Sequence, residues 1–424
     1  MKSIYLIAPL TAAALITATS PLLAAVDRSD VLDTYANIAQ AAYQDSLSTA
    51  QTLRTTIQIL LEIPSEQSLN EAREAWILAR IPYQQTEVYR FGNAIVDDWE
   101  GKVNAWPLDE GLIDYVDGSY GTDSEENGFY TANIIANPSV NINGQLIDAN
   151  IITPELLSTQ LHEAGGIESN VATGYHAIEF LLWGQDLNGS QAGAGDRPYT
   201  DFDVNNCSNN HCDRRAAYLT AVTDLLLTDL EYMASAWASG GEARTALGAI
   251  GDNAGLATML TGMGSLSYGE LAGERMQLGL MLHDPEEEHD CFADNTSASH
   301  FYDGIGIQNI FNGSYQRVDG STVSGPSLRE LLASSDADLS DELGDDIQAS
   351  VDALQRLLDS QHNGQAYDQL IAEGNTNGNE MVQTAIDALI HQTRNIERAV
   401  VALGVTRIEF EGSGSLDDPS SVFQ

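Results

Sequence analysis

The sequence is poor in basic residues. Its 18 Lys and Arg stand against 62 Asp and Glu, which gives a formal net charge of −44 at pH 7. A surface of this sign repels nucleic acid and anionic lipid, whereas it concentrates cations. We therefore exclude nucleic acid as a partner. The charge itself fits either a solubility adaptation to a salty habitat or the gathering of cations.

Long hydrophobic runs are absent after the N-terminus, where no segment approaches the 18 or more apolar residues of a membrane helix. The first residues, MKSIYLIAPLTAAALITATSPLLAA, contain Lys2, an apolar run and a small-residue end at Ala25. This pattern predicts a secretory signal peptide over residues 1–25. No Cys follows the run, which argues against a lipid anchor. We expect an exported protein, either free in the periplasm or cell envelope or peripherally attached to the outer membrane.

Cysteines are few, and only Cys207, Cys212 and Cys291 occur. An export compartment permits disulfides. In NCSNNHCD, Cys207 and Cys212 are five positions apart in a polar loop, with His211 between them. We predict a small loop disulfide here and keep a Cys/His metal site as the alternative. One thiol is then left over, and the sequence does not identify which.

Alternating strand patterns are also scarce, and helical periodicity dominates. After residue 213, apolar residues recur at spacings of three and four, and the same holds near the C-terminus. Residues 29–62 and 66–91 predict two further long helices, separated at Pro64, with Ser65 as the N-cap. Residues 117–152 and 184–212 are rich in Gly, Asn, Ser and Asp and predict loops. The fold class is therefore all-α.

A weak internal repeat suggests how the helices are organised. YHAIEFLLWG at 175–184 resembles YDGIGIQNIFNG at 302–313, with Asp303 in place of His176 and Gly306 in place of Glu179. This favours a duplication in which one half kept the chemistry. We expect two related helical-bundle domains, residues 26–200 and 201–424, with the functional motif in the first.

His176 and Glu179 are the strongest candidates for chemistry. They lie three positions apart in the apolar stretch TGYHAIEFLLWGQD, so one helix face would present a nitrogen and an oxygen to the same point. Such donors suit iron, zinc or manganese better than calcium. On spacing alone, the commoner explanation is a His and a Glu that hydrogen-bond to each other inside the bundle.

Several other motifs fail at a decisive position. HEAGG at 162–166 begins like the zinc-peptidase motif His-Glu-x-x-His, but Gly166 stands where the second His belongs. Phe180 follows Glu179 where the inverted motif needs a His. There is no Gly-x-Ser-x-Gly elbow and no P-loop. We interpret DPEEEHD at 284–290 as a surface loop, with an acidic metal-collecting loop as the alternative.

The stretch GYHAIEFLLWGQD resembles the Gly-x-His-x-x-Glu signature of the imelysin family, also called peptidase M75, which includes the iron-regulated protein A group. Further blocks are similar to this family at 82–117, 206–226 and 273–313. The resemblance implies two related helical bundles joined in one chain. It also implies one of two activities, because the family includes a proposed insulin-cleaving metallopeptidase and components of envelope iron acquisition.

The resemblance also implies site residues. His176 and Glu179 match the signature as metal ligands, and Glu87 in QTEVYR resembles a third ligand from a neighbouring helix. Further positions match family blocks and would line the site, or would form a buried salt-bridge network between helices; they are Gly174, Arg90, Glu270, Glu274 and Arg275.

We therefore expect a metal-binding protein of bacterial iron acquisition. The cofactor is iron, with zinc as the alternative, and the ligand is a metal ion or a small iron chelate. Partners would be envelope iron-uptake components. The alternative function is a zinc-dependent metallopeptidase in which Glu179 or Glu87 acts as general base. Because a metal needs a neutral imidazole, binding should weaken as pH falls through roughly 6 to 7.

Overall fold

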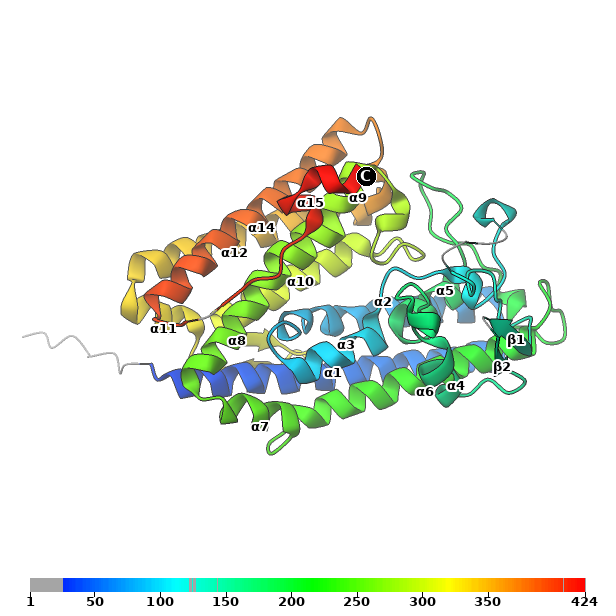
Figure 1. The fold of residues 1–424 in the computed structure, drawn as a ribbon, viewed down its shortest axis with the longest axis horizontal. Coiled ribbons are helices and arrows are strands. Elements are labelled where there is room, and N and C mark those ends of the chain that lie inside the picture. Colours follow the sequence, from blue (N-terminus) through cyan, green and yellow to red (C-terminus); the bar gives the residue numbers. More distant parts are fainter. Residues whose placement is uncertain (1–25, 122–123, 125–126, 143, 407, 424) are drawn as a thin grey trace, which may run out of the picture.

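The computed structural model describes residues 26–121, 124, 127–142, 144–406 and 408–423, so the predicted signal peptide lies outside the described residues. The described chain is mostly helical (Figure 1). Its strands form two short antiparallel hairpins, β1 (Ser139–Ile142) with β2 (Gln145–Asp148) and β3 (Ser314–Gln316) with β4 (Thr322–Ser324). The prediction of an all-α fold is confirmed. Among the described residues, no helix combines the length and the apolar character needed to cross a membrane.

The first group of helices is built around α1 (Arg28–Glu62), which packs along α2 (Glu66–Gln84) and α6 (Cys212–Ala236). The predicted break between the first two helices is confirmed, because the Ser65 side chain caps α2 by accepting a hydrogen bond from the Ser68 amide. Beside these helices lie η1 (Glu87–Tyr89), α3 (Ala94–Asn104), α5 (Gly174–Trp183) and α7 (Glu242–Ala249). In Figure 1, α1, α6 and α7 lie along the lower side of the molecule.

The second group contains α12 (Ala337–His362) packed on α14 (Thr376–Ala402), with α10 (Thr296–Asn312) against α12. One continuous run passes from α8 (Asp252–Ser265) through the π-helical η7 (Leu266–Gln277) into α9 (Leu278–Leu282). Smaller helices complete this group, namely η8 (Pro285–Glu287), α11 (Leu328–Ser335), α13 (Tyr367–Ile371) and α15 (Gly414–Asp417). Short turns elsewhere are η2 (Glu110–Leu112), η3 (Gly118–Tyr120), α4 (Pro154–Leu156), η4 (Leu157–Leu161), η5 (Ala164–Gly166), η6 (Tyr199–Asp201) and η9 (Pro419–Phe423).

The two similar segments of the sequence occupy comparable places. Both α5, which carries His176, and α10, which carries Asp303, pack against α2. In α10, Gly306 brings the helix so close to α2 that an added Cβ would lie 2.8 Å from the Gln85 carbonyl oxygen. Because α6 packs on α1 and α5, helices from beyond residue 200 contribute to both groups. The duplication and the boundary at residue 200 stay predictions.

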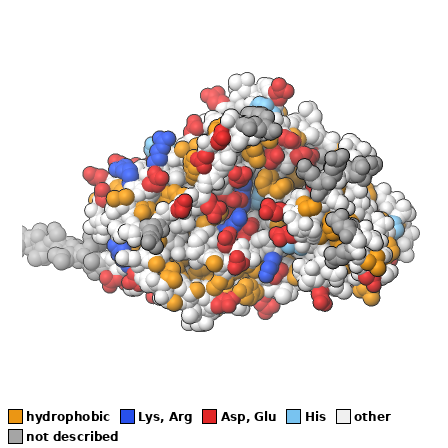
Figure 2. All heavy atoms as spheres, in the orientation of Figure 1, with side chains coloured by type: hydrophobic (Ala, Val, Ile, Leu, Met, Phe, Trp, Pro, Cys, Tyr) orange, Lys and Arg blue, Asp and Glu red, His pale blue; other side chains and the backbone are white. Residues whose placement is uncertain are grey.

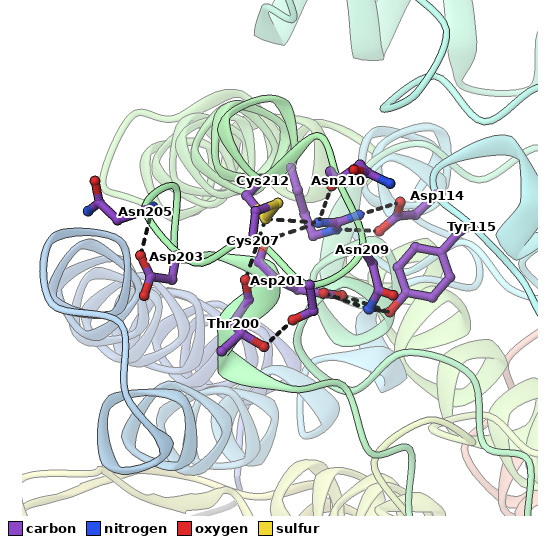
Figure 3. The surroundings of a disulfide bond; sticks show 12 residues. Asp114, Tyr115, Thr200, Asp201, Asp203, Asn205, Cys207, Asn209, Asn210 and Cys212 are labelled. Carbon is purple, nitrogen blue, oxygen red and sulfur yellow. Dashed lines mark hydrogen bonds and ion pairs between the residues drawn. A yellow bond between two sulfur atoms is a disulfide. The ribbon is translucent and has the colours of Figure 1, made fainter.

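The disulfide joins Cys207 to Cys212, as predicted, with their Cα atoms 6.0 Å apart, and Cys291 is the free, half-buried thiol. Figure 3 shows the bond at the start of α6, beside Asp114 and Tyr115. One turn into the helix, Arg215 donates to both oxygens of Asp114, at 2.6 and 3.0 Å. The polar loop before α6 is tied to the helix by the disulfide and by hydrogen bonds from Arg215 to the Asp201 and Asn210 carbonyl oxygens, and Arg215 joins the helix to Asp114.

Candidate metal centre

Gly174 places the signature helix. It is the first residue of α5 and has φ +79°, a conformation that L side chains rarely adopt. A Cβ at this position would lie only 2.4 Å from the Val103 carbonyl oxygen. The glycine of the signature is thus required by both conformation and close approach, and it brings the start of α5 against the end of α3.

His176 and Glu179 lie on one face of α5, as their spacing predicts. His176 Nδ1 is 3.0 Å from Glu179 Oε2, and the other Glu179 oxygen accepts the Ala293 amide at 2.9 Å. Their exposed fractions are 2% and 0%. The second ring nitrogen of His176, Nε2, is buried and has no hydrogen-bond partner. An orienting carboxylate on one nitrogen and an unused second nitrogen are typical of a histidine that is prepared to bind a metal.

His289 and Asp290 complete the group. The sequence placed them only in the DPEEEHD stretch, under the alternative of a metal-collecting loop, and not among the site residues. They lie in the connection between η8 and α10, within the segment that we interpreted as a surface loop, yet both are buried. One ligand atom from each of His176, His289 and Asp290 lies within 4.8 Å of the others. The two imidazoles meet edge to face with ring centroids 4.7 Å apart. The surface-loop interpretation is wrong at these positions, because the polar interior supplies partners for them.

Asp290 is the charged member of the group. Arg80 of α2 donates to both of its oxygens, at 2.7 and 3.3 Å, and Asn295 and Ser299 donate as well. Burial alone would raise the pKa of Asp290, but the Arg80 guanidinium holds that pKa well below its usual range. Asp290 is therefore ionised, and its charge is shared between Arg80 and the side of the site that faces the histidines.

Both histidines are held neutral. Burial, followed by the charge of Arg80, lowers the pKa of His176 to about 3. Burial, followed by the charge of Arg275, lowers the pKa of His289 well below its usual range. Neutral imidazoles are the form that binds metals. Because desolvation keeps the His176 ring neutral between pH 6 and 7, protonation of this ring would not weaken metal binding in that interval as we expected.

The pKa of Glu179 is shifted in the direction that also favours its neutral form, which for a carboxyl group is upward. Burial, and then the charge of Asp290, raise its pKa well above the usual range. With a proton on Glu179, the pair is neutral and stable in the interior. A cation beside His176 would favour the ionised carboxylate, which would accept a hydrogen bond from Nδ1–H and leave the Nε2 lone pair available.

A cavity of about 460 Å³ reaches the two histidines, and its wall is acidic. The carboxylates that line it belong to Asp109, Glu110, Asp186, Glu286 and Glu287, and the described lining residues include no Lys or Arg. Acidic side chains also predominate over basic ones on the face in Figure 2. The field at this entrance therefore attracts cations and opposes anions.

Glu87 is not brought to the His176 group. Its carboxylate instead accepts a hydrogen bond from Arg275 at 2.8 Å, and Arg275 also donates to Glu270 at 2.8 Å and to Asp303 at 3.1 Å. The buried guanidinium of Arg275 compensates the charge of Glu87, so this carboxylate needs no metal.

Most of the other residues that we expected to line the site belong to the same ion-pair network as Glu87. Arg90 lies 3.5 Å from Glu270 and 3.7 Å from Glu100, which extends the network around Arg275. Arg90, Glu270 and Arg275 thus match the alternative of a buried salt-bridge network between helices. Glu274 is half-buried and lies outside this network. Burial, and then the charges of Asp284 and Glu274, raise the pKa of Glu287 at the cavity wall.

Known proteins with similar sequences or folds were found in three comparisons. A segment of 79 residues is 32% identical to the iron-regulated protein A of Synechococcus elongatus, and it covers 19% of this chain and 20% of that relative. The crystal structure of a protein described as an iron-regulated protein A precursor, from Parabacteroides distasonis, superposes with a TM-score of 0.63. That match covers 89% of this chain and 95% of the other at 18% identity, so it shows a shared fold. The sequence model of the imelysin family matches residues 39–396, well over half of the chain, and the protein therefore belongs to the imelysin family.

Proposed function

We propose that this imelysin-family protein binds a transition-metal cation at His176, His289 and Asp290, with Glu179 orienting His176. The supporting observation is the convergence of two neutral imidazoles and one ionised carboxylate within 4.8 Å at the end of an acidic cavity. Two histidines and one carboxylate are a common donor set for non-haem iron and for zinc. The unpartnered Nε2 of His176 offers a donor that the protein itself does not use.

The proposed cargo is a bare cation, and not an anionic iron chelate. Carboxylate-based and catecholate-based chelates of iron carry negative charge, and the cavity wall presents five acidic residues to them. The same wall raises the local concentration of a hydrated cation. This favours the metal ion over the small chelate, the other ligand that the sequence suggested.

Iron is the metal that we favour, in bacterial iron acquisition. The two relatives named above both carry the name iron-regulated protein A, which supports a link to iron. The predicted signal peptide supports a location in the periplasm or cell envelope, where components of iron uptake would receive the ion. The donor set accepts zinc as well, which stays the alternative metal.

The test is metal content after loading with Fe²⁺ under anaerobic conditions and, separately, with Zn²⁺. We expect one tightly bound equivalent in the wild type, none in His176→Ala and none in His289→Ala. His391→Ala is the matched control, because that histidine is exposed and forms an ion pair with Asp346. One retained equivalent in both site variants would reject the proposal.

Two further measurements examine the roles assigned to Glu179 and to the acidic wall of the cavity. Glu179→Gln should keep the stoichiometry but weaken binding by about 10- to 100-fold, as expected for a residue that orients a metal ligand. A citrate chelate of Fe³⁺ should bind much more weakly than Fe²⁺, and equal affinities would contradict the selection of a bare cation.

A second candidate function is a metallohydrolase, and Glu110 favours it. Burial raises the pKa of this cavity-lining carboxyl group to about 7, which is suitable for a general base near neutral pH. Zinc held by three protein ligands supplies an acidic water in such enzymes. Glu179 is less suited to this role, because both of its oxygens are engaged. Chelator-sensitive cleavage of an unfolded protein, lost in Glu110→Gln at unchanged metal content, would support the hydrolase.

A further inference from the structure

A second cavity, of about 280 Å³, lies between α2, α10 and α12. Among the described residues, its lining has no member in common with that of the acidic cavity. The lining includes the exposed His362 and the fully buried Gln84, so the cavity extends from the surface into the interior. Its volume is close to the lower end of the range for ligand pockets, which is roughly 300 Å³. The cavity is therefore large enough for a small organic molecule.

Much of the cavity wall is hydrocarbon. The apolar and aromatic side chains that line it come from all three helices and are Ile77, Ile81, Ala298, Tyr302 and Leu358. An ordered water needs roughly two to four polar partners, and the aliphatic side chains offer none. This part of the cavity therefore favours an apolar group over water.

Gln84 is the polar residue at the buried end of the cavity. Positions 77, 80, 81 and 84 of α2 all line the cavity, and this spacing of three and four residues defines one helix face. Gln84 is 0% exposed, and neither Nε2 nor Oε1 of its amide has a hydrogen-bond partner among the described residues. Nearly all buried polar groups are paired, because an unpaired one is costly. An unpaired amide that borders a cavity therefore points to an occupant of that cavity.

Asn295, the N-cap residue of α10, contributes a second unpaired group. It is 2% exposed and lines the same cavity. Its Nδ2 donates to Asp290 at 2.9 Å, whereas its Oδ1 has no partner among the described residues. Arg80 also lines the cavity, but it donates twice to Asp290, which balances its charge. The cavity thus offers two unpaired acceptor oxygens and one unpaired NH2 donor, and the buried charge in its lining is already paired.

We infer that this cavity binds a small neutral molecule that has a primary amide group on an apolar body. The carbonyl oxygen of the ligand accepts from Gln84 Nε2, and its N–H groups donate to Gln84 Oε1 and Asn295 Oδ1. A carboxylate or a ketone of the same shape has no N–H group and leaves both acceptors unpaired. The apolar body packs between the aliphatic side chains and Tyr302. This site needs no metal at the His176 group.

Ligand-observed NMR with benzamide and metal-free protein tests this assignment. Benzamide combines the amide group with an apolar ring, and we expect saturable binding with a Kd on the order of 1 mM, which is usual for a ligand of this size. Benzoate and acetophenone keep the ring but lack the N–H donors. Both should bind about 10-fold more weakly or worse, because the two acceptors stay unpaired in the complex.

Two variants alter the cavity in different ways. Gln84→Met keeps the length of the side chain but removes both amide atoms, and it should weaken benzamide binding by about 10-fold or more. Ala298→Leu fills the cavity from α10 and should also abolish binding, so it provides the test if the first variant does not fold. Gln85→Met is the matched control, because the Gln85 amide donates to the Ile81 carbonyl oxygen at 3.0 Å and accepts from Asn309 at 2.9 Å. This variant should bind benzamide like the wild type.

His176→Ala separates this site from the proposed function. It should bind benzamide like the wild type, whether or not the metal centre holds a cation, because the two cavities have separate linings. Loss of binding in His176→Ala would place the ligand in the acidic cavity and overturn the assignment. So would the lack of a saturable benzamide signal, which would leave ordered water as the occupant, or equal binding by the wild type, Gln84→Met and Ala298→Leu. Equal affinities for benzamide and acetophenone would overturn the recognition of an amide.

Discussion

Replacing Arg275 by Met tests the balance of charge in the interior most directly. Arg275 is 1% exposed and donates to Glu87, Glu270 and Asp303, which come from three different elements. Met has a similar length and no charge. After the change, Arg90 stays near Glu270, whereas Glu87 and Asp303 lose the only cation paired with them among the described residues.

The size of the effect follows from burial. Removing one partner of a buried ion pair typically costs about 3–5 kcal/mol, because an uncompensated charge is left behind. Two carboxylates are left in this way, and the middle of that range gives an expected loss of about 4 kcal/mol in the free energy of unfolding at pH 7. At roughly 2.1 cal/mol/K per residue for the unfolding entropy, this corresponds to a fall in Tm of about 5 °C.

Urea unfolding at pH 7 is the assay, with Arg398→Met as the matched control. Arg398 and Glu342 form an exposed pair at 2.6 Å, and exposed pairs contribute at most about 1 kcal/mol. The triple variant Arg275→Met with Glu87→Gln and Asp303→Asn should regain most of the lost stability. If Arg275→Met lowered the free energy of unfolding no more than Arg398→Met does, the assignment of a charge-balancing role to Arg275 would be refuted.

Three other predictions concern single features. Glu87→Gln should retain the metal stoichiometry of the wild type in elemental analysis, because this carboxylate pairs with Arg275, and loss of the metal would restore Glu87 as a ligand. The raised pKa of Glu110, about 7, means that the folded state holds its proton more tightly, so stability falls as pH rises from about 4.5 to 7, by at most about 3 kcal/mol. Glu110→Gln should remove this component of the pH dependence of urea midpoints, and an unchanged dependence would contradict it. The paired replacements Cys207→Ser and Cys212→Ser should lower the free energy of unfolding by about 2 kcal/mol, from the entropy of a six-residue loop, whereas equal midpoints with and without reductant would count against this.

Local features of the sequence predicted most of the helices. The apolar positions of α6, such as Leu219, Leu226 and Met233, are buried as their spacing of three and four residues indicates. Ser65 and the Cys207–Cys212 bond were predictable for the same reason, since each depends on neighbours only a few positions away. His176 and Glu179 meet because one helical turn separates them.

The remainder of the site depends on contacts across the chain. Asp290 is buried because Arg80, 210 positions earlier, neutralises it, and Glu87 is held by Arg275 from 188 positions away. Nothing near DPEEEHD in the sequence indicates that a guanidinium will enclose its last residue, and its acidic composition favours a surface loop. Charge pairing between distant helices therefore decided which acidic residues remain available to a metal.

His176 and Asp303 lie on two helices that both pack against α2, but their side chains meet different partners. At the first position, the ring lines the acidic cavity. At the second, Asp303 receives the guanidinium of Arg275, a positive group that is covalently part of the chain and cannot be exchanged. The positive group beside Asp303 is therefore fixed in the chain, whereas any cation beside His176 would be free to exchange with the solvent.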